Sequence, residues 1–157
     1  MAVEAYSLRC AGDDVLAYRY ASGPLRVSES PDIAAARISG ADLADPLLPV
    51  IVHSTSWRHL SDGTIVLTYI VASDPQPAQP AVPVLNLDIA RGPDSRHPTP
   101  TEIQSEHVAA HAIRHLAFIA DTDPQVSMAL TAWPRLRAAL ACLPRHPAGQ
   151  LPGTATS

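Results

Sequence analysis

The chain has 157 residues, the length of one domain, and its 46% hydrophobic and 17% charged content favours a globular fold over disorder. A formal net charge of -4 gives no basic surface for a nucleic-acid backbone, and the lack of a long apolar run excludes a membrane span. All eleven basic residues are arginine, a composition typical of GC-rich bacterial genomes.

The N-terminus and the cysteines favour the cytoplasm. Residues 1–4 have neither the basic region nor the apolar segment of a signal peptide. Cys10 and Cys142 are far apart and form no metal-ligand pattern. We therefore expect a cytoplasmic protein whose two thiols are reduced and buried, and which uses no cofactor and no metal.

The first predicted elements are a short strand and a helix. Val15 to Tyr20 alternates in the manner of a strand, and Gly23-Pro24 ends it. Ser30 is a good N-cap, Pro31 suits the first helical position, and Gly40 ends the helix that follows.

The strongest pattern is a β-hairpin. Two apolar runs, Leu47 to His59 and Thr64 to Val71, are joined by Ser61-Asp62-Gly63, and Asp-Gly tolerates the backbone of a tight turn. The second run is apolar on nearly every residue, as in a strand covered on both faces. We therefore expect this hairpin at the centre of the sheet, with Val66 and Leu67 buried.

A proline-rich connector over residues 74–80 leads to Val82 to Leu87, a candidate edge strand because Pro83 cannot donate to a ladder. Residues 91–98 are expected to form a loop. The remaining chain is expected to be helical. Residues 99–102, Thr-Pro-Thr-Glu, form a capping box that starts a helix to about Ala120.

Two shorter helices are expected next, from Asp123-Pro124 to Leu130 and from Pro134 to Leu143. The sequence therefore predicts a single globular domain over residues 1–144, followed by a flexible proline-rich tail over residues 145–157.

Residues around the first helix carry a resemblance to a known family. Gly23, Glu29 and Arg37 fall at the spacings of the Nudix box, and Ser30-Pro31 also agrees with it. The chain resembles the Nudix superfamily, which implies an α+β fold: an α/β/α sandwich with a central mixed sheet, here with a helical C-terminal half. It also implies that Glu29 and Arg37 pair to tie a loop to the helix.

The catalytic half of that motif is missing. In the family, glutamates after the arginine hold Mg²⁺ or Mn²⁺ against a diphosphate. Ile38, Ala41 and Asp42 stand at these positions, so one carboxylate remains. Asp45 or Asp88 could supply further oxygens only by converging on Asp42. The resemblance thus implies a degenerate Nudix box without its metal site.

The first strand of the hairpin is rich in polar residues. Strict alternation places His53, Thr55, Trp57 and His59 on one face and Ser54, Ser56 and Arg58 on the other. Arg58 requires a carboxylate, a phosphate or solvent, so an ion pair to Asp42 or Glu29 and an anion site both remain open. The ligand-binding candidates are Arg58, Ser54, Ser56, Trp57 and, on the other strand, Tyr69.

Three histidines, His107, His111 and His115, recur every fourth residue of the expected long helix. The drift of this stripe toward the apolar face predicts that His115 is a boundary residue and that the other two are solvated. A pair at i and i+4 can hold a transition metal, but no His-Glu-x-x-His pattern is present. The candidate general bases are His53, His111 and His115.

Three functions follow from these patterns. The preferred hypothesis is a Nudix-like domain that binds a small, anionic or nucleotide-like molecule or acts as a regulatory module. The first alternative is an enzyme that uses one of the candidate histidines as general base with Arg58 holding an anion. The second is a homodimeric interaction protein. A nucleic-acid or membrane partner is not expected.

Overall fold

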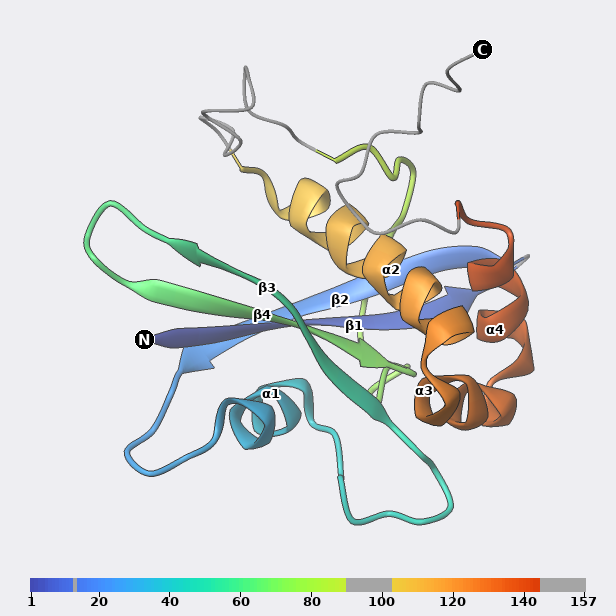
Figure 1. The fold of residues 1–157 in the computed structure, drawn as a ribbon, viewed down its shortest axis with the longest axis horizontal. Coiled ribbons are helices and arrows are strands. Elements are labelled where there is room, and N and C mark those ends of the chain that lie inside the picture. The colour runs from blue at the N-terminus through green and yellow to red at the C-terminus, as the bar shows by residue number, and fades with distance from the viewer. Residues whose placement is uncertain (13, 90–102, 145–157) are drawn as a thin grey trace.

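The computed structural model describes residues 1–12, 14–89 and 103–144, which form a five-stranded mixed sheet with helices on both faces (Figure 1). The strands are β1 (Ala2–Ala11), β2 (Val15–Pro24), β3 (Ile51–His59), β4 (Ile65–Ala72) and β5 (Val82–Pro83), in the order β3-β4-β1-β2-β5. The helices are α1 (Pro31–Ser39), α2 (Ser105–Thr122), α3 (Pro124–Ala129) and α4 (Pro134–Ala141), with a 3-10 turn at Leu130–Ala132.

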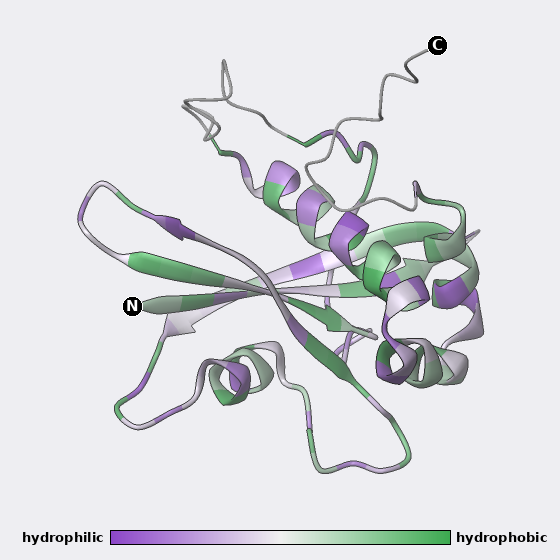
Figure 2. Cartoon of the chain, viewed as in Figure 1, coloured by the Kyte–Doolittle hydropathy of each residue, from purple (hydrophilic) through white to green (hydrophobic). Residues whose placement is uncertain are grey.

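The sheet separates two hydrophobic cores. On one face, α1 packs its alanines against Val3 and Tyr69, while α2, α3 and α4 cover the other face around Tyr6, Ile70 and Leu116. Figure 2 shows β4 as largely hydrophobic and α2 as striped with hydrophobic and hydrophilic residues, as expected for a buried strand and an amphipathic helix. The α+β class with a central mixed sheet is confirmed.

The middle strand is β1, which the sequence patterns did not predict. It pairs antiparallel with β2 and parallel with β4, so the expectation that the β3-β4 hairpin is central is wrong, and β3 lies at an edge. Both faces of β1 are covered, and it carries two buried polar residues, Glu4 and Ser7. Its polar residues therefore do not alternate with apolar ones, and no period-2 signal is present.

The first helix has the predicted caps. The Ser30 side chain accepts a hydrogen bond from the Ile33 amide at 3.3 Å, and Pro31 occupies the first turn. Gly40 adopts the left-handed conformation, with φ of 81°, and its N–H donates to Ala36 O at 2.9 Å. The segment from Ser30 to Gly40 is thus specified by local sequence.

The predicted hairpin is also present. Asp62 accepts the Thr64 amide at 2.8 Å, and Gly63 has a φ of 84°. The first strand begins at Ile51 and not at Leu47. Val66 is buried as expected, but Leu67 is only half-buried, since α1 covers this face incompletely.

The C-terminal half differs from expectation in its details. The edge strand β5 has only two residues, in keeping with Pro83. Helix α2 begins at Ser105, later than expected, and has no side-chain cap. The expected loop at 91–98, capping box at 99–102 and tail at 145–157 lie outside the described residues. Asp123 caps α3 through the Gln125 amide, at 2.8 Å.

Two further observations concern the whole of the described chain. Cys10 is half-buried and Cys142 is exposed, so the expectation of two buried thiols is wrong; both are free. Within residues 1–12, 14–89 and 103–144, none of the helices has both the length and the apolar content needed to cross a bilayer.

Candidate functional site

The three residues that match the Nudix box lie together beside α1. Arg37 donates a hydrogen bond to each carboxylate oxygen of Glu29, with Nε–Oε1 at 2.7 Å and Nη2–Oε2 at 2.9 Å. The hydrogen bond from Arg37 is the main reason that the pKa of Glu29 falls to about 2. A Cβ on Gly23 would lie 3.2 Å from Cγ2 of Ile38, so glycine allows β2 to approach α1 closely. The predicted Glu29–Arg37 pair is confirmed.

The residues at the family's metal-binding positions lie in different environments. Ile38 is half-buried and packs against the core under α1, and Asp42 accepts the Ala44 amide at 2.9 Å. Asp45 lines the same pocket as Asp42, but Asp88 lines another. Within the part of the chain that the structure describes, no three His, Cys, Asp or Glu side chains are grouped so that they could hold a metal ion.

A β-bulge changes which residues of β3 share a face. Ser54 lies opposite Tyr69, whereas Ser56 lies opposite Thr68, so Thr55 is an extra residue. The alternation of side chains shifts by one position at such a bulge.

The predicted grouping of the polar residues of β3 is therefore wrong. His53, Ser56 and Arg58 lie opposite Ile70, Thr68 and Val66, on the side of α2, while Ser54 lies opposite Tyr69, on the side of α1. The sequence Ser-Thr-Ser does not reveal the shift, because its three hydroxyl residues are equally suited to either face. The bulge brings His53 and Arg58 to the same side of the sheet.

The partner of Arg58 is Glu4, and not Asp42 or Glu29 as considered from the sequence. Its guanidinium donates to both Glu4 oxygens, with Nη2–Oε2 at 2.7 Å, and Glu4 also accepts the Thr68 hydroxyl at 2.6 Å. Glu4 is 1% exposed. The hydrogen bond that Arg58 donates to Glu4 raises the pKa of Arg58, so this arginine is a permanent cation already bound to a buried anion.

Tyr69 and Trp57, two other ligand-binding candidates, differ in burial: Tyr69 is buried and Trp57 is exposed. The Tyr69 hydroxyl donates to Asp32 at 2.7 Å, and burial raises the pKa of Tyr69 to about 12. Trp57 is 68% exposed. Tyr69 thus fastens α1 to the sheet, and Trp57 is available at the surface.

The histidines form one contact across the layers. Nε2 of His115 lies 3.2 Å from Nε2 of His53, and the rings stack with centroids 5.3 Å apart. His107 and His111 are half-buried rather than solvated as expected, and the Nδ1 atom of each is buried without a hydrogen-bond partner. Burial is the main reason that the pKa values of His111 and His115 are lowered, so both favour the neutral form.

Several of these residues line one small pocket between β3 and the start of α2. Its volume is about 160 Å³. The residues that line it include Ser56, Trp57, Arg58, His107 and His111. His53, His115, Ser54 and Tyr69 do not line it, so the structure assembles only part of the predicted set.

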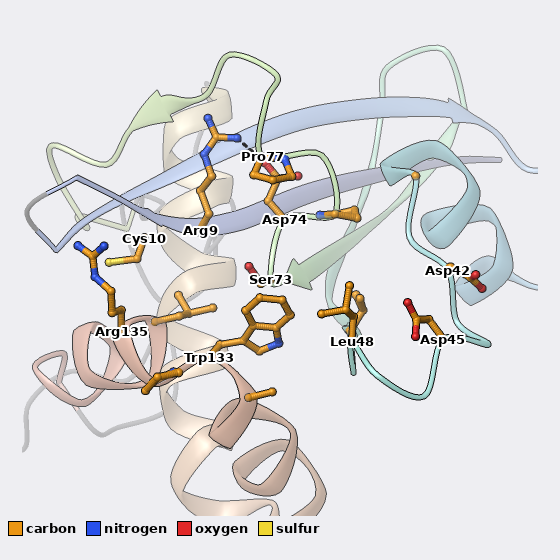
Figure 3. Close-up of a pocket in the computed structure, with 16 residues that line it drawn as sticks. Arg9, Cys10, Asp42, Asp45, Leu48, Ser73, Asp74, Pro77, Trp133 and Arg135 are labelled. Atoms are coloured by element: carbon orange, nitrogen blue, oxygen red, sulfur yellow. Dashed lines mark hydrogen bonds and ion pairs between the residues drawn. The ribbon is translucent and has the colours of Figure 1, made fainter.

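A larger pocket lies at the carboxyl ends of the parallel strands β1 and β4 (Figure 3). Its volume is about 590 Å³. Arg9 and Cys10 enter it from the end of β1, and Ser73 and Asp74 follow β4 directly. The loop after α1 and the start of α4, with Trp133, form the remaining walls. Ligands of open α/β sheets commonly bind at such strand ends.

A buried carboxylate stabilises one wall of this pocket. The Asp74 side chain is fully buried and accepts Arg9 Nη1 at 2.9 Å and Arg19 Nη2 at 3.0 Å. Arg19 also donates to Ser39 O at 2.6 Å, and Arg9 donates to Gln79 O at 2.8 Å. The cluster fixes the segment after β4 against β1, β2 and the end of α1.

Of the residues that line this pocket, the sequence patterns had indicated Asp42 and Asp45 as carboxylates that could converge, but not Arg9, Asp74 or Trp133. Arg9 lies in the unpredicted strand β1, and Asp74 was assigned to a connector. Trp133 precedes α4 and received no role. The available signal was Asp74 placed directly after a buried strand, where polar residues gather at a sheet edge.

Comparison of the chain with protein-family models, with curated proteins and with solved structures gave no match.

Proposed function

We propose that this protein is a small-molecule-binding domain whose ligand occupies the pocket at the carboxyl ends of β1 and β4. The observation that supports this proposal is the pocket itself. Its volume of about 590 Å³ is typical of a site for a small organic ligand. Trp133, Leu48 and Val50 give it apolar walls, and Arg9 and Asp74 give it fixed polar groups.

We also propose that the chain is a degenerate Nudix-like domain. The structural pair Glu29–Arg37 and the close approach at Gly23 are retained, whereas Ile38 packs against the core and Ala41 offers no oxygen for a hard cation. A binding or regulatory role fits a scaffold that keeps the fold-determining half of the motif. Asp42, at a family metal position, lines the pocket in which the ligand is proposed to bind.

The two tryptophans allow a direct test. A fragment library is screened by the ¹H–¹⁵N signals of the indole N–H groups, which number two in this chain, from Trp57 and Trp133. Fragments that bind should shift the Trp133 signal and leave Trp57 in place. Binding should be lost in Leu48→Trp, which fills the pocket, and retained in Trp57→Phe.

Two results would count against the proposal. One is a screen in which no fragment moves the Trp133 signal. The other is a set of binders that still bind Leu48→Trp with unchanged affinity, while thermal unfolding shows that the variant is folded.

A second candidate function is hydrolytic catalysis in the smaller pocket, because Ser56 and Arg58, on the α2 side of β3 after the bulge, line it together with His111. Burial lowers the pKa of His111, which keeps it in the neutral form that a general base requires. The test is turnover of activated ester and phosphate substrates. His111→Gln should abolish activity, whereas His59→Gln, a change at an exposed histidine, should not. Equal rates in both variants would exclude this role for His111.

A further inference from the structure

We infer that the ligand of the larger pocket carries a protonated amine attached to an apolar body. This inference rests on the proposed function, since it concerns the ligand class of the same site. It follows from three observations: which charged groups in the pocket are already paired, which are not, and what lies between them.

The arginines of the pocket already have anionic partners. Arg9 is bound to Asp74, with Nη1–Oδ2 at 2.9 Å, and its Nη2 donates to Gln79 O. Arg135 pairs with Asp14, with Nη2–Oδ1 at 3.2 Å, and donates to the carbonyl of Gly12. An anionic ligand would have to displace the buried Asp74 carboxylate from Arg9, whereas at Arg135 it would compete only with an exposed carboxylate and a backbone carbonyl.

Two carboxylates of the pocket lack such partners. Asp42 accepts only the Ala44 amide, and Asp45 accepts only the Leu47 amide, at 2.8 Å, so neither has a cationic partner among the described residues. Each carboxylate has further lone pairs for a donor. This end of the pocket therefore carries two uncompensated negative charges.

An aromatic wall separates the two ends. Trp133 Nε1 donates to Pro49 O at 3.1 Å, which holds the indole in place. Figure 3 shows Asp42 and Asp45 at one end, Cys10 and Arg135 at the other, and Trp133 with Leu48 between them. This order suits an organic cation, because the indole and Leu48 can bind the apolar body while the two carboxylates bind the ammonium group.

Three probes with one carbon skeleton test the charge requirement: 4-phenylbutylamine, 4-phenylbutan-1-ol and 4-phenylbutanoate. Titrations are followed by the Trp133 indole signal, with the Trp57 signal as internal control. The amine should bind at least about fivefold more tightly than the alcohol, and the carboxylate more weakly than both. The preference should disappear in the double variant Asp42→Asn/Asp45→Asn and persist in Asp88→Asn, which alters a carboxylate of a different pocket.

The outcomes separate the ligand class from the binding function. If the alcohol or carboxylate shifts the Trp133 signal at equal or lower concentration than the amine, the inference is overturned while the pocket remains a binding site. An amine preference that survives the double variant also overturns it. If none of the probes moves Trp133 but library fragments do, the ligand class is wrong; if fragments also fail, the proposed function fails with it.

Discussion

At the scale of single residues, the ion pair between Arg58 and Glu4 is a polar contact with a buried carboxylate. Glu4 lies in the middle strand at 1% exposure and depends on Arg58 and Thr68 for its hydrogen bonds. The sequence indicated that Arg58 needed an anion, but it could not identify Glu4, because strand β1 was not recognised. A buried carboxylate deprived of its cation retains the cost of desolvation without the compensating attraction.

Arg58→Ala should therefore lower the free energy of unfolding by about 3 kcal/mol. Urea denaturation measures the change. Arg135→Ala is the matched control, since it removes an exposed ion pair with Asp14 and should cost less than about 1 kcal/mol. Similar losses in the two variants would show that Glu4 is not dependent on Arg58.

The lowered pKa values of His111 and His115 predict how the stability of the protein depends on pH. In the unfolded chain a histidine titrates near its ordinary value of 6.5, while burial lowers the pKa in the folded protein. The unfolded state therefore binds more protons just below pH 6.5. The stability due to the neutral imidazoles is complete above this pH and is lost as the pH falls through the folded pKa values.

Urea unfolding at pH 7.5 and 5.5 checks this dependence. The wild type should be less stable at pH 5.5, and the double variant His111→Gln/His115→Gln should show a smaller loss. His59→Gln, at an exposed histidine, should keep the wild-type dependence. The same pH dependence in the double variant as in the wild type would refute the assignment.

At the scale of elements, sequence predicted well where the cause of structure is local. The caps of α1 at Ser30 and Gly40 and the turn at Gly63 depend on a few adjacent residues, and each was located correctly. Prediction failed for β1 and for the faces of β3, where the cause is a distant partner or a bulge. The larger pocket belongs to the second group, since its walls come from segments that only the parallel pairing of β1 and β4 brings together.

The close packing of α1 on β2 gives a prediction for an element contact. Gly23→Val should clash with Ile38 and destabilise the protein by about 1 to 3 kcal/mol, because a Cβ alone would already lie 3.2 Å from the Ile38 methyl. Ile38→Ala introduced into that variant should recover part of the loss, as a double-mutant cycle measured by thermal unfolding would show. The control is Ser22→Val at an exposed neighbour. If the stability changes of Gly23→Val and Ile38→Ala were additive, the two positions would not be in contact.

At the scale of the whole molecule, the three layers place the motif residues of α1 and the two pockets in separate regions. The α1 face carries the Glu29–Arg37 pair, the α2 face carries the histidines, and the larger pocket lies at the end of the sheet. Only Asp42 of the family's metal positions contributes a carboxylate to that pocket. Under the proposal of a degenerate Nudix-like domain, the structural pair of the motif is present and most of its oxygen ligands are missing.

We therefore expect negligible Mg²⁺-dependent or Mn²⁺-dependent hydrolysis of nucleoside diphosphate derivatives, because one or two carboxylates bind a hard cation too weakly to activate water against a diphosphate. A panel of such substrates, assayed with each metal and with chelator, measures this. Robust metal-dependent release that disappears in Asp42→Ala would show that Asp42, with Asp45, forms a working metal site.

The position of β1 in the sheet has a consequence for synthesis of the protein on the ribosome. Ala2 pairs with Val66 and Leu8 with Ala72, so β1 emerges long before the strand that completes the hydrogen bonds of its second edge. Until then, a nascent chain holding β1, β2 and α1 presents unpaired amides and carbonyls beside buried-type side chains such as Val3 and Tyr6. Stalled or truncated chains that end before β4 should therefore depend on chaperones for solubility, whereas chains extended past Ala72 can close the sheet themselves.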